Sequence, residues 1–400
     1  MSDFNFGDLK KTYENFREPK AMLVVNGQEL TADLPLNIIG VEVELTSGYE
    51  SSIATVTLAG VFDADNKRFN IKKVKQYLYL GSTIVIYLGY ATAVREVFRG
   101  FIARVHFVVP DMYSGTIPSI ELTAMDVKGL MMANRHSKRL KSQYFSDAVK
   151  EILNANPFIS QMDATGKQFI TLNVSNTPDK PPGSENSGAG GAGGAGGAGG
   201  KQPTTDRRVE MVEESDYEFI VKAAKKFNFE FFAVGGVLYF IEAKKNQELL
   251  MELNPLMGMN NIDVGYDITG LVKSVVVRNI DMEQGKYIGN KKKSKTKISL
   301  GNKAKPLVEK QTMVYLDPTT DSKEAAGYRA SYLMDSVDYR LGSVVSEYVG
   351  MPEIIPGRFI KLKGFGQPLD NTFYLTTVRH IMNKEVFVTR FEGCANTIGS

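Results

Sequence analysis

The sequence contains few of the residues from which metal sites and disulfide frameworks are built. Among its 400 residues there is one cysteine, Cys394, and there are three histidines, His106, His136 and His380. A single cysteine excludes an internal disulfide and a cysteine metal cluster, which fits folding in a reducing cytoplasm. The histidines show no His-x-x-x-His spacing, and an isolated histidine in a strand usually packs or hydrogen-bonds. We therefore predict no metal site and no disulfide scaffold.

A large net charge and long apolar runs are also lacking. Lys and Arg number 48 against 45 for Asp and Glu, and the formal charge of +3 predicts neither a nucleic-acid-binding protein nor a polybasic membrane protein. No run of about 18 apolar residues occurs, and residues 1–20 lack the charged and then apolar pattern of a signal peptide. We expect no nucleic-acid partner, no stable membrane insertion and no export through a cleaved leader.

Motifs of nucleotide binding and catalysis are missing as well. The segment 285–290, GKYIGN, lacks the glycine spacing and the Lys-Ser/Thr pair of a phosphate-binding loop, and we predict a turn. The basic run 291–297, KKKSKTK, has no interleaved aromatic residues for base stacking, so we expect a solvated loop. Acidic residues such as Glu213, Glu214 and Asp216 are not marked by their context as an acid and base pair. We predict that the protein is not an enzyme and has no catalytic residues and no cofactor.

The residues that are present predict an α+β protein that is mainly β. Residues 22–125 contain strand after strand, such as VEVELTSG and IATVTLAG, separated by Gly, Asp, Asn and Pro turns. This pattern predicts a small antiparallel barrel or sandwich. Residues 127–157 become helical, with Ser146 and Asp147 as expected caps and Pro157 preventing continuation.

A capped helix followed by a hairpin is the most distinctive local pattern. Ser215 and Glu218 have the spacing of a capping box, and Gly235-Gly236 can supply the positive φ angles of a tight hairpin. Apolar residues at three- and four-residue steps predict one buried helical stripe, formed by Phe219, Ile220, Ala223, Ala224 and Phe227. Before this unit, residues 188–200 read GAGGAGGAGGAGG, a composition that predicts a flexible tether.

A second β-rich region begins near residue 268, includes a helix at about 322–339, and echoes the first region. Gly81 precedes Phe98 by 17 residues, and Gly357 precedes Tyr374 by the same distance. The spacing favours a duplicated barrel, and chance similarity between two amphipathic hairpins is the alternative. We thus predict two similar small β-barrel domains that flank a mixed α/β middle region.

These patterns divide the chain into six predicted segments. They are an N-terminal extension (1–20), a first β-barrel domain (21–126), a helical or α+β connector (127–180), a flexible Gly/Ala-rich linker (181–208), a helix plus β-hairpin domain (209–265) and a second β-barrel domain with a helical insert (266–395).

Several blocks in this order resemble one known family. They are the helix and hairpin unit at 215–243, LTSGYESSIATVTLAG at 45–60, SIELTAMDVKGLM at 119–131 and the closing segment that starts with MPEIIPG at 351–357. Together they resemble the baseplate hub family of contractile tails, which comprises VgrG proteins, the phage late control D proteins and the hubs of extracellular contractile injection systems. The resemblance touches most of the chain outside residues 1–20 and the Gly/Ala tract. The resemblance carries over no expectation of a spike domain within this chain.

The resemblance implies a structural protein of a phage tail or tail-like particle. Such a hub is a homotrimer that adapts the hexameric inner tail tube to the trimeric puncturing spike, because three chains with two barrels each present six similar barrels. The implied partners are the inner tube protein, a spike or spike-tip protein and baseplate wedge proteins. The particle would assemble in the bacterial cytoplasm and could be released. A non-enzymatic β-rich module that binds surfaces or carbohydrates is the alternative, and a muralytic hydrolase ranks third.

Overall fold

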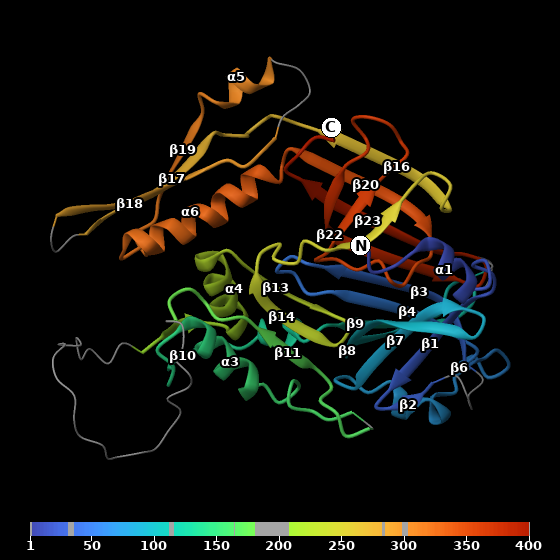
Figure 1. Ribbon diagram of the computed structural model, residues 1–400. Helices are drawn as coiled ribbons and strands as arrows, with labels where there is room; N and C mark the ends of the chain where they lie inside the picture. Colours follow the sequence, from blue (N-terminus) through green and yellow to red (C-terminus); the bar gives the residue numbers. More distant parts are fainter. Residues whose placement is uncertain are drawn as a thin grey trace.

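The computed structural model describes residues 2–30, 36–111, 116–163, 165–180, 208–281, 285–297 and 303–399 (Figure 1). The Gly/Ala tract at 188–200, and with it almost all of the predicted linker 181–208, lies outside the described residues. Within them, no helix has both the length and the apolar composition needed to cross a bilayer.

One large antiparallel sheet forms the body, and its strands come from both ends of the chain (Figure 1). The first half contains β1 (Pro19–Val25), β2 (Gln28–Glu29), β3 (Asn37–Thr46), β4 (Ile53–Ala59), β7 (Thr83–Tyr90), β8 (Ala93–Val108) and β9 (Ser119–Met125). The second half contains β15 (Leu249–Leu253), β16 (Met259–Tyr266), β20 (Gly342–Val349), β21 (Phe359–Leu362), β22 (Thr372–Asn383) and β23 (Phe387–Ala395). Among the described strands of this sheet, β15 and β21 form the one parallel pair. The sheets confirm the mainly β, α+β class.

The boundary that we placed at residue 265 does not follow this sheet. β15 and β16 belong to the second half, although the sequence grouped them with the helix and hairpin unit. Their partners β20 and β21 lie some distance further along the chain, and a local pattern cannot report such pairing. A short hairpin, β5 (Phe62–Asp63) with β6 (Arg68–Phe69), and the 3-10 turns η1 (Ile71–Lys73) and η2 (Lys75–Tyr77) lie between β4 and β7.

The middle block packs against the first half of the sheet. It contains α2 (Lys128–Met131), β10 (His136–Arg139), α3 (Phe145–Ala155), β11 (Thr171–Val174), β12 (Glu210–Glu214), α4 (Asp216–Phe227), β13 (Phe229–Val234) and β14 (Val237–Glu242). β10 pairs with β12, and β14 lies between β11 and β13. Its apolar core also takes in Val85 of β7 and Phe101 of β8, so the block shares side chains with the sheet.

The helix and hairpin of this block agree with the sequence prediction. Ser215 Oγ accepts a hydrogen bond from the Glu218 amide at 3.0 Å, and Glu218 Oε2 accepts one from the Ser215 amide at 2.8 Å, which completes the capping box. The predicted stripe is buried, Phe219 completely. Gly235 and Gly236 have φ angles of 58° and 73° and close the β13–β14 hairpin.

The capping prediction for α3 is wrong. The helix begins at Phe145, so Ser146 lies inside its first turn, and the Ser146 hydroxyl has no hydrogen-bond partner. The free amides are instead satisfied by residues that follow β11. The Phe145 amide donates to Asp179 at 3.0 Å and the Ser146 amide donates to Thr177 Oγ1 at 2.9 Å. A cap supplied from some thirty residues away leaves no local sequence signal.

An arm projects from the second half of the sheet (Figure 1). It consists of β17 (Ser274–Asp281), β18 (Lys286–Lys293), β19 (Thr312–Leu316), α5 (Ala304–Val308) and α6 (Lys323–Asp338). α6 covers one face of the three-stranded sheet and begins at the Ser322 cap, close to the prediction. The expected turn at 285–290 is wrong, because only Gly285 lies in the turn and β18 starts at Lys286. The expected loop at 291–297 is also partly strand, because β18 continues to Lys293. Exposed lysines suit an edge strand such as β18.

A partly buried charge network fixes the arm to the body. Lys244, which follows β14, lies 2.7 Å from Asp335 of α6 and 3.8 Å from Glu230 of β13. Tyr374 of β22 donates a hydrogen bond to Glu230 at 2.7 Å. Burial raises the pKa of Glu230, although Lys244 and Tyr374 offset part of that rise. Burial alone lowers the pKa of Lys244, but Asp335 and Glu230 outweigh it and leave that pKa raised.

The N-terminal segment bridges the two halves of the sheet. Its backbone lies beside β15, where the Asp3 amide donates a hydrogen bond to the Leu249 carbonyl at 3.0 Å. After α1 (Phe6–Thr12), the Tyr13 hydroxyl donates to Glu353 at 2.6 Å, and the Tyr13 ring packs 5.5 Å from that of Tyr90. The segment therefore contacts β7 in the first half and the β20–β21 connection in the second.

We expect Phe219→Ala to lower the free energy of unfolding by roughly 3 to 5 kcal/mol, because it empties a fully buried ring site in the core of the middle block. Urea unfolding followed by circular dichroism measures the change. Lys222→Ala, on the exposed side of the same helix, should change stability by less than about 0.5 kcal/mol. Equal effects of the two variants would contradict the assignment of the buried stripe.

We expect Lys244→Met to lower the free energy of unfolding by roughly 1 to 3 kcal/mol, because it leaves the partly buried carboxylates of Glu230 and Asp335 without a cation. Lys222→Met is the matched control, since Lys222 pairs with Glu214 at the surface. The network would not be needed for stability if both variants unfolded at the same urea concentration.

Candidate assembly site

The two halves of the sheet repeat the same strand order. The first half reads β3-β4-β9-β8-β7, and the second reads β16-β20-β23-β22-β21. Every neighbouring pair in both series is antiparallel. Each half is therefore built on one plan.

The irregularities of the two halves coincide too, which fixes their alignment residue by residue. The register shifts between Ile102 and Arg104 where β8 meets β9, and between Leu375 and Thr377 where β22 meets β23. Before these strands, the Gly81 amide donates to the Ile102 carbonyl at 2.8 Å and the Gly357 amide donates to the Leu375 carbonyl at 2.9 Å. Both glycines have φ angles near 80°, where other residues are strained. Ile102 and Leu375 thus occupy equivalent positions.

This alignment corrects the correspondence that we drew from spacing. Phe101 pairs with Thr83, and Tyr374 pairs with Phe359, so the equivalent of Tyr374 is Phe101. Phe98, which the 17-residue spacing selected, lies three residues earlier on β8. Both Phe98 and Phe101 are buried aromatic residues of one strand, and a residue count alone cannot choose between them.

A ladder between β22 and β3 joins the two halves. Thr377 to Asn383 of β22 pair with Thr46 to Gly40 of β3, beside the short segment of β22 that pairs with β21. On the outer face, Arg379 donates to Glu44 at 3.0 Å and lies 3.4 Å from Glu42.

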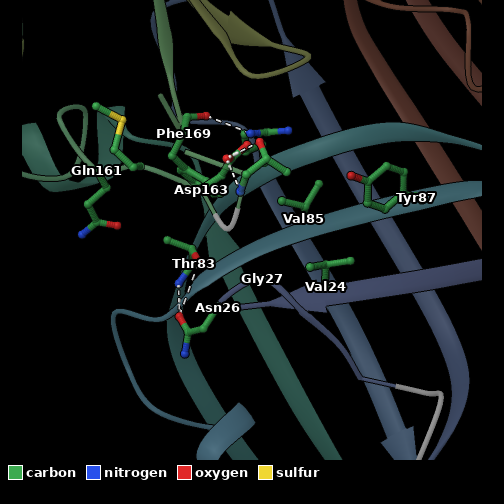
Figure 2. A pocket seen from close by; sticks show the side chains of 12 residues that line it. Val24, Asn26, Gly27, Thr83, Val85, Tyr87, Gln161, Asp163 and Phe169 are labelled. Atoms are coloured by element: carbon green, nitrogen blue, oxygen red, sulfur yellow. Dashed lines mark hydrogen bonds between the residues drawn. The ribbon is translucent and has the colours of Figure 1, made fainter. Parts of the chain in front are cut away.

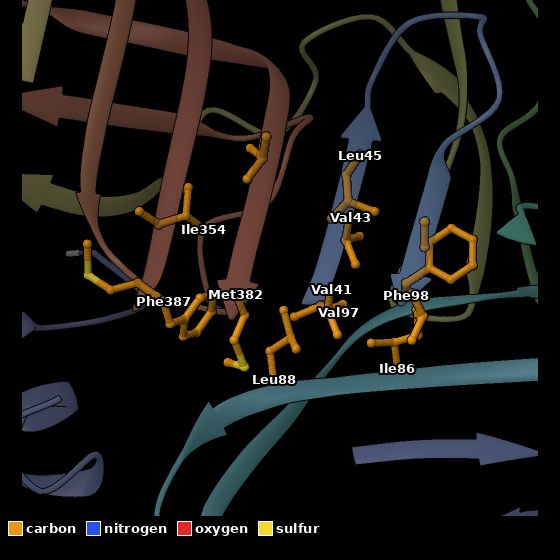
Figure 3. Close-up of a cluster of buried hydrophobic side chains, with 14 of the residues drawn as sticks. Val41, Val43, Leu45, Ile86, Leu88, Val97, Phe98, Ile354, Met382 and Phe387 are labelled. Atoms are coloured by element: carbon orange, nitrogen blue, oxygen red, sulfur yellow. The ribbon is translucent and has the colours of Figure 1, made fainter. Parts of the chain in front are cut away.

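On the inner face the apolar core runs on across the junction. Met382 of β22 lies near Val41 of β3, and both belong to one cluster that includes Leu88 and Phe387 (Figure 3). Because hydrogen bonds, an ion pair and the core all cross this line, the halves form one rigid sheet.

The strands equivalent to those of this junction have open edges. β16, the equivalent of β3, lies at one end of the sheet, and among the described residues β20 is its one strand partner. On β8, the equivalent of β22, residues 104–108 pair with β9 on one side, and among the described residues no strand pairs with them on the other. Phe107 and Val109 are 41% and 58% exposed there. Unpaired edges with exposed apolar residues are sites where another chain can add a strand.

A pocket of about 370 Å³ lies between the β1–β7–β8 surface and the segment 161–169 (Figure 2). Arg99 at its wall is held by Glu96 at 2.6 Å and by the Phe169 carbonyl at 3.1 Å. Asp163 accepts hydrogen bonds from Thr165 and Lys167, which lower its pKa. These charged groups have structural partners and include no paired nucleophile and base. The expectation of a non-enzymatic protein remains a prediction.

The residues that the sequence singled out lie apart from one another. His380 is buried at the β22–β3 junction, where Nδ1 lies 3.0 Å from Thr389 Oγ1 and burial lowers its pKa to about 4. His136 lies in β10, 3.3 Å from Asp216, and His106 lies on the open edge of β8. Burial raises the pKa of the Cys394 thiol to about 12. Within the described part of the chain, no cluster of three or more His, Cys, Asp or Glu could hold a metal ion.

Comparison of sequences finds no family model and no curated protein that matches. Comparison of structures finds close matches to solved proteins. A tail protein from Neisseria meningitidis has a TM-score of 0.63 and 10% identity, over 95% of this chain and 97% of that one. The 43 kDa tail protein of prophage MuSo2 from Shewanella oneidensis has a TM-score of 0.64 and 8% identity, over 94% and 98%.

A component of the type VI secretion system of E. coli, described as similar in structure to the T4 bacteriophage tail proteins gp27 and gp5, also matches. Its TM-score is 0.53 with 11% identity, over 93% of this chain and 76% of that one. At such low identity the likeness concerns the fold. The chain therefore has the fold of these phage tail and type VI secretion proteins, the baseplate hub fold that the resemblance in its sequence implied.

Proposed function

We propose that the protein is the structural hub of a contractile-tail baseplate, a homotrimer that adapts a six-fold inner tube to a three-fold spike. The observation that carries the proposal is the duplicated strand order within one chain. Three chains with two equivalent halves present six similar units, and one ring can then match both symmetries. In this proposal, residues 21–126 form the first, tube-docking barrel domain, and the second barrel domain comprises residues 266–395 together with β15 and β16.

The similar structures support a role in a tail. Two of them are tail proteins, and a third is a component of a type VI secretion system. By analogy, we infer that this chain contacts an inner tube protein, a spike or spike-tip protein and baseplate wedge proteins. Assembly would take place in the bacterial cytoplasm, and the chain would act as scaffold without catalysis.

The duplication also favours this proposal over a surface-binding or carbohydrate-binding module. A module that binds one ligand gains nothing from two halves that agree in strand order and in the position of their register shifts. An adaptor between rings of different symmetry requires such agreement, since its two halves must present equivalent surfaces to identical tube subunits.

We expect the purified chain to form a trimer, alone or with its tube and spike partners, because β16 and residues 104–108 of β8 each have one side without a strand partner among the described residues. Size-exclusion chromatography with multi-angle light scattering gives the molar mass against the 44.2 kDa of one chain. A mass that stays at one chain at high concentration and with both partners present would refute the trimer.

A further inference from the structure

We propose that β8 of one chain pairs antiparallel with β16 of the next chain, in the register that the β22–β3 ladder already shows within each chain. The inference rests on the proposed trimer and specifies which residues close it.

The two halves can be aligned along one row of residues that pair across neighbouring strands. The row in the first half is Val43, Ala54, Ala124 and Ile102, and the row in the second is Val264, Val344, Gly393 and Leu375. The first strand of each half has a register shift at the same position, between Ile38 and Gly40 in β3 and between Met259 and Asn261 in β16. Val264 on β16 is therefore the equivalent of Val43 on β3.

This alignment transfers the register. Within one chain, His380 pairs with Val43. His380 lies five residues after Leu375, and Phe107 lies five residues after the equivalent Ile102, so Phe107 takes the position of His380. The transferred register places Phe107 of one chain opposite Val264 of the next. It also places Val108 opposite Asp263, and Arg104 opposite Asp267.

Charge along the two edges fits this register. In the intrachain junction Arg379 contacts Glu42, which lies diagonally across the ladder. The equivalents of these two residues are His106 and Asp263, so an imidazole lies diagonally across from a carboxylate. Glu44, which faces Arg379 directly, has Gly265 as its equivalent.

Arg104 faces Asp267 directly, and both are exposed in the single chain. Within the chain Arg104 lies 3.6 Å from Glu121 and Asp267 accepts a hydrogen bond from the Thr269 amide, so the joint would add a second partner to each. Opposite charges on facing positions stabilise a strand pair, whereas like charges destabilise it.

Apolar side chains along the edges fit as well. Phe107 and Val109 are exposed on β8 and just beyond it. The register places them opposite Val264 and Ile262, which are half-buried against the main core. Pairing would extend that core across the joint, as the Val41 and Met382 contact does inside the chain.

The joint is heterologous, because β8 and β16 are different surfaces of the same chain. Such contacts build rings when the rotation closes. If the interchain joint copies the intrachain one, three chains contain six equivalent joints, alternately within and between chains.

Disulfide crosslinking tests the register. In the double variant Val108→Cys, Asp263→Cys, the substituted positions face each other across the joint at a Cα separation of about 4.5 to 5.5 Å, within disulfide range. Oxidation should give covalent trimers on a non-reducing gel. Chains with one substitution each, mixed together, should give covalent dimers only, because each chain then carries half of one joint.

Three controls make the result specific. Val108→Cys with Asp267→Cys is four residues out of register, about 13 Å along the strand, and should not crosslink. Ile381→Cys with Glu42→Cys is the intrachain counterpart and should oxidise without forming larger species. The parent chain should stay uncrosslinked, because its Cys394 is half-buried in β23 and lies on neither open edge.

Charge reversal supplies an independent measurement. Arg104→Glu should weaken the trimer about tenfold in a dilution series, and Asp267→Arg in the same chain should restore it. Lys141→Glu, on an exposed residue outside both edges, should leave the dissociation constant unchanged.

The outcomes separate the two proposals. A trimer that gives no in-register disulfide, or that crosslinks equally well out of register, would overturn the β8–β16 pairing and leave the hub intact. A chain that remains a monomer by light scattering would overturn both.

Discussion

The hydrogen-bond ladder between β22 and β3 is the interaction on which the rest of the structure depends. It joins strands more than 330 residues apart in the chain and turns two equivalent halves into one sheet with one core. The ladder sets the angle between the halves, because backbone hydrogen bonds permit little sliding once one face is buried. The arm and the middle block are then attached to a platform whose geometry is already fixed.

Local patterns allowed much of the fold to be predicted. The capping box at Ser215 and the hairpin at Gly235 lie within a few residues of the groups that they organise, and the structure has both. The mainly β class followed from alternating strands for the same reason. The lysines at 291–293 show the limit of this approach, since a solvated loop and an edge strand both expose such side chains.

Long-range pairing was not accessible from the sequence. The cap of α3 comes from Thr177 and Asp179, and the partner of β15 is β21, so neither feature leaves a nearby signal. The duplication was visible as a spacing, but its register depends on the irregular positions beside Ile102 and Leu375. The open edges of β8 and β16 read as ordinary amphipathic strands, because a strand sequence does not reveal how many neighbours it has.

The N-terminal segment has a consequence for the order in which the protein can fold. Tyr13 binds Glu353, 340 residues further along, and Asp3 binds Arg358 at 2.6 Å. During synthesis, Asp3 and Tyr13 must therefore wait for residues about 340 positions later in the chain before they reach their final places. Until β22 has been made, the edge of β3 also lacks the strand with which it pairs. Contacts of such sequence separation slow folding and leave apolar surface open to chaperones or to a wrong partner. If chains join through strand edges as proposed, the open edges of β8 and β16 have to stay apart from the unfinished sheet of their own chain during synthesis.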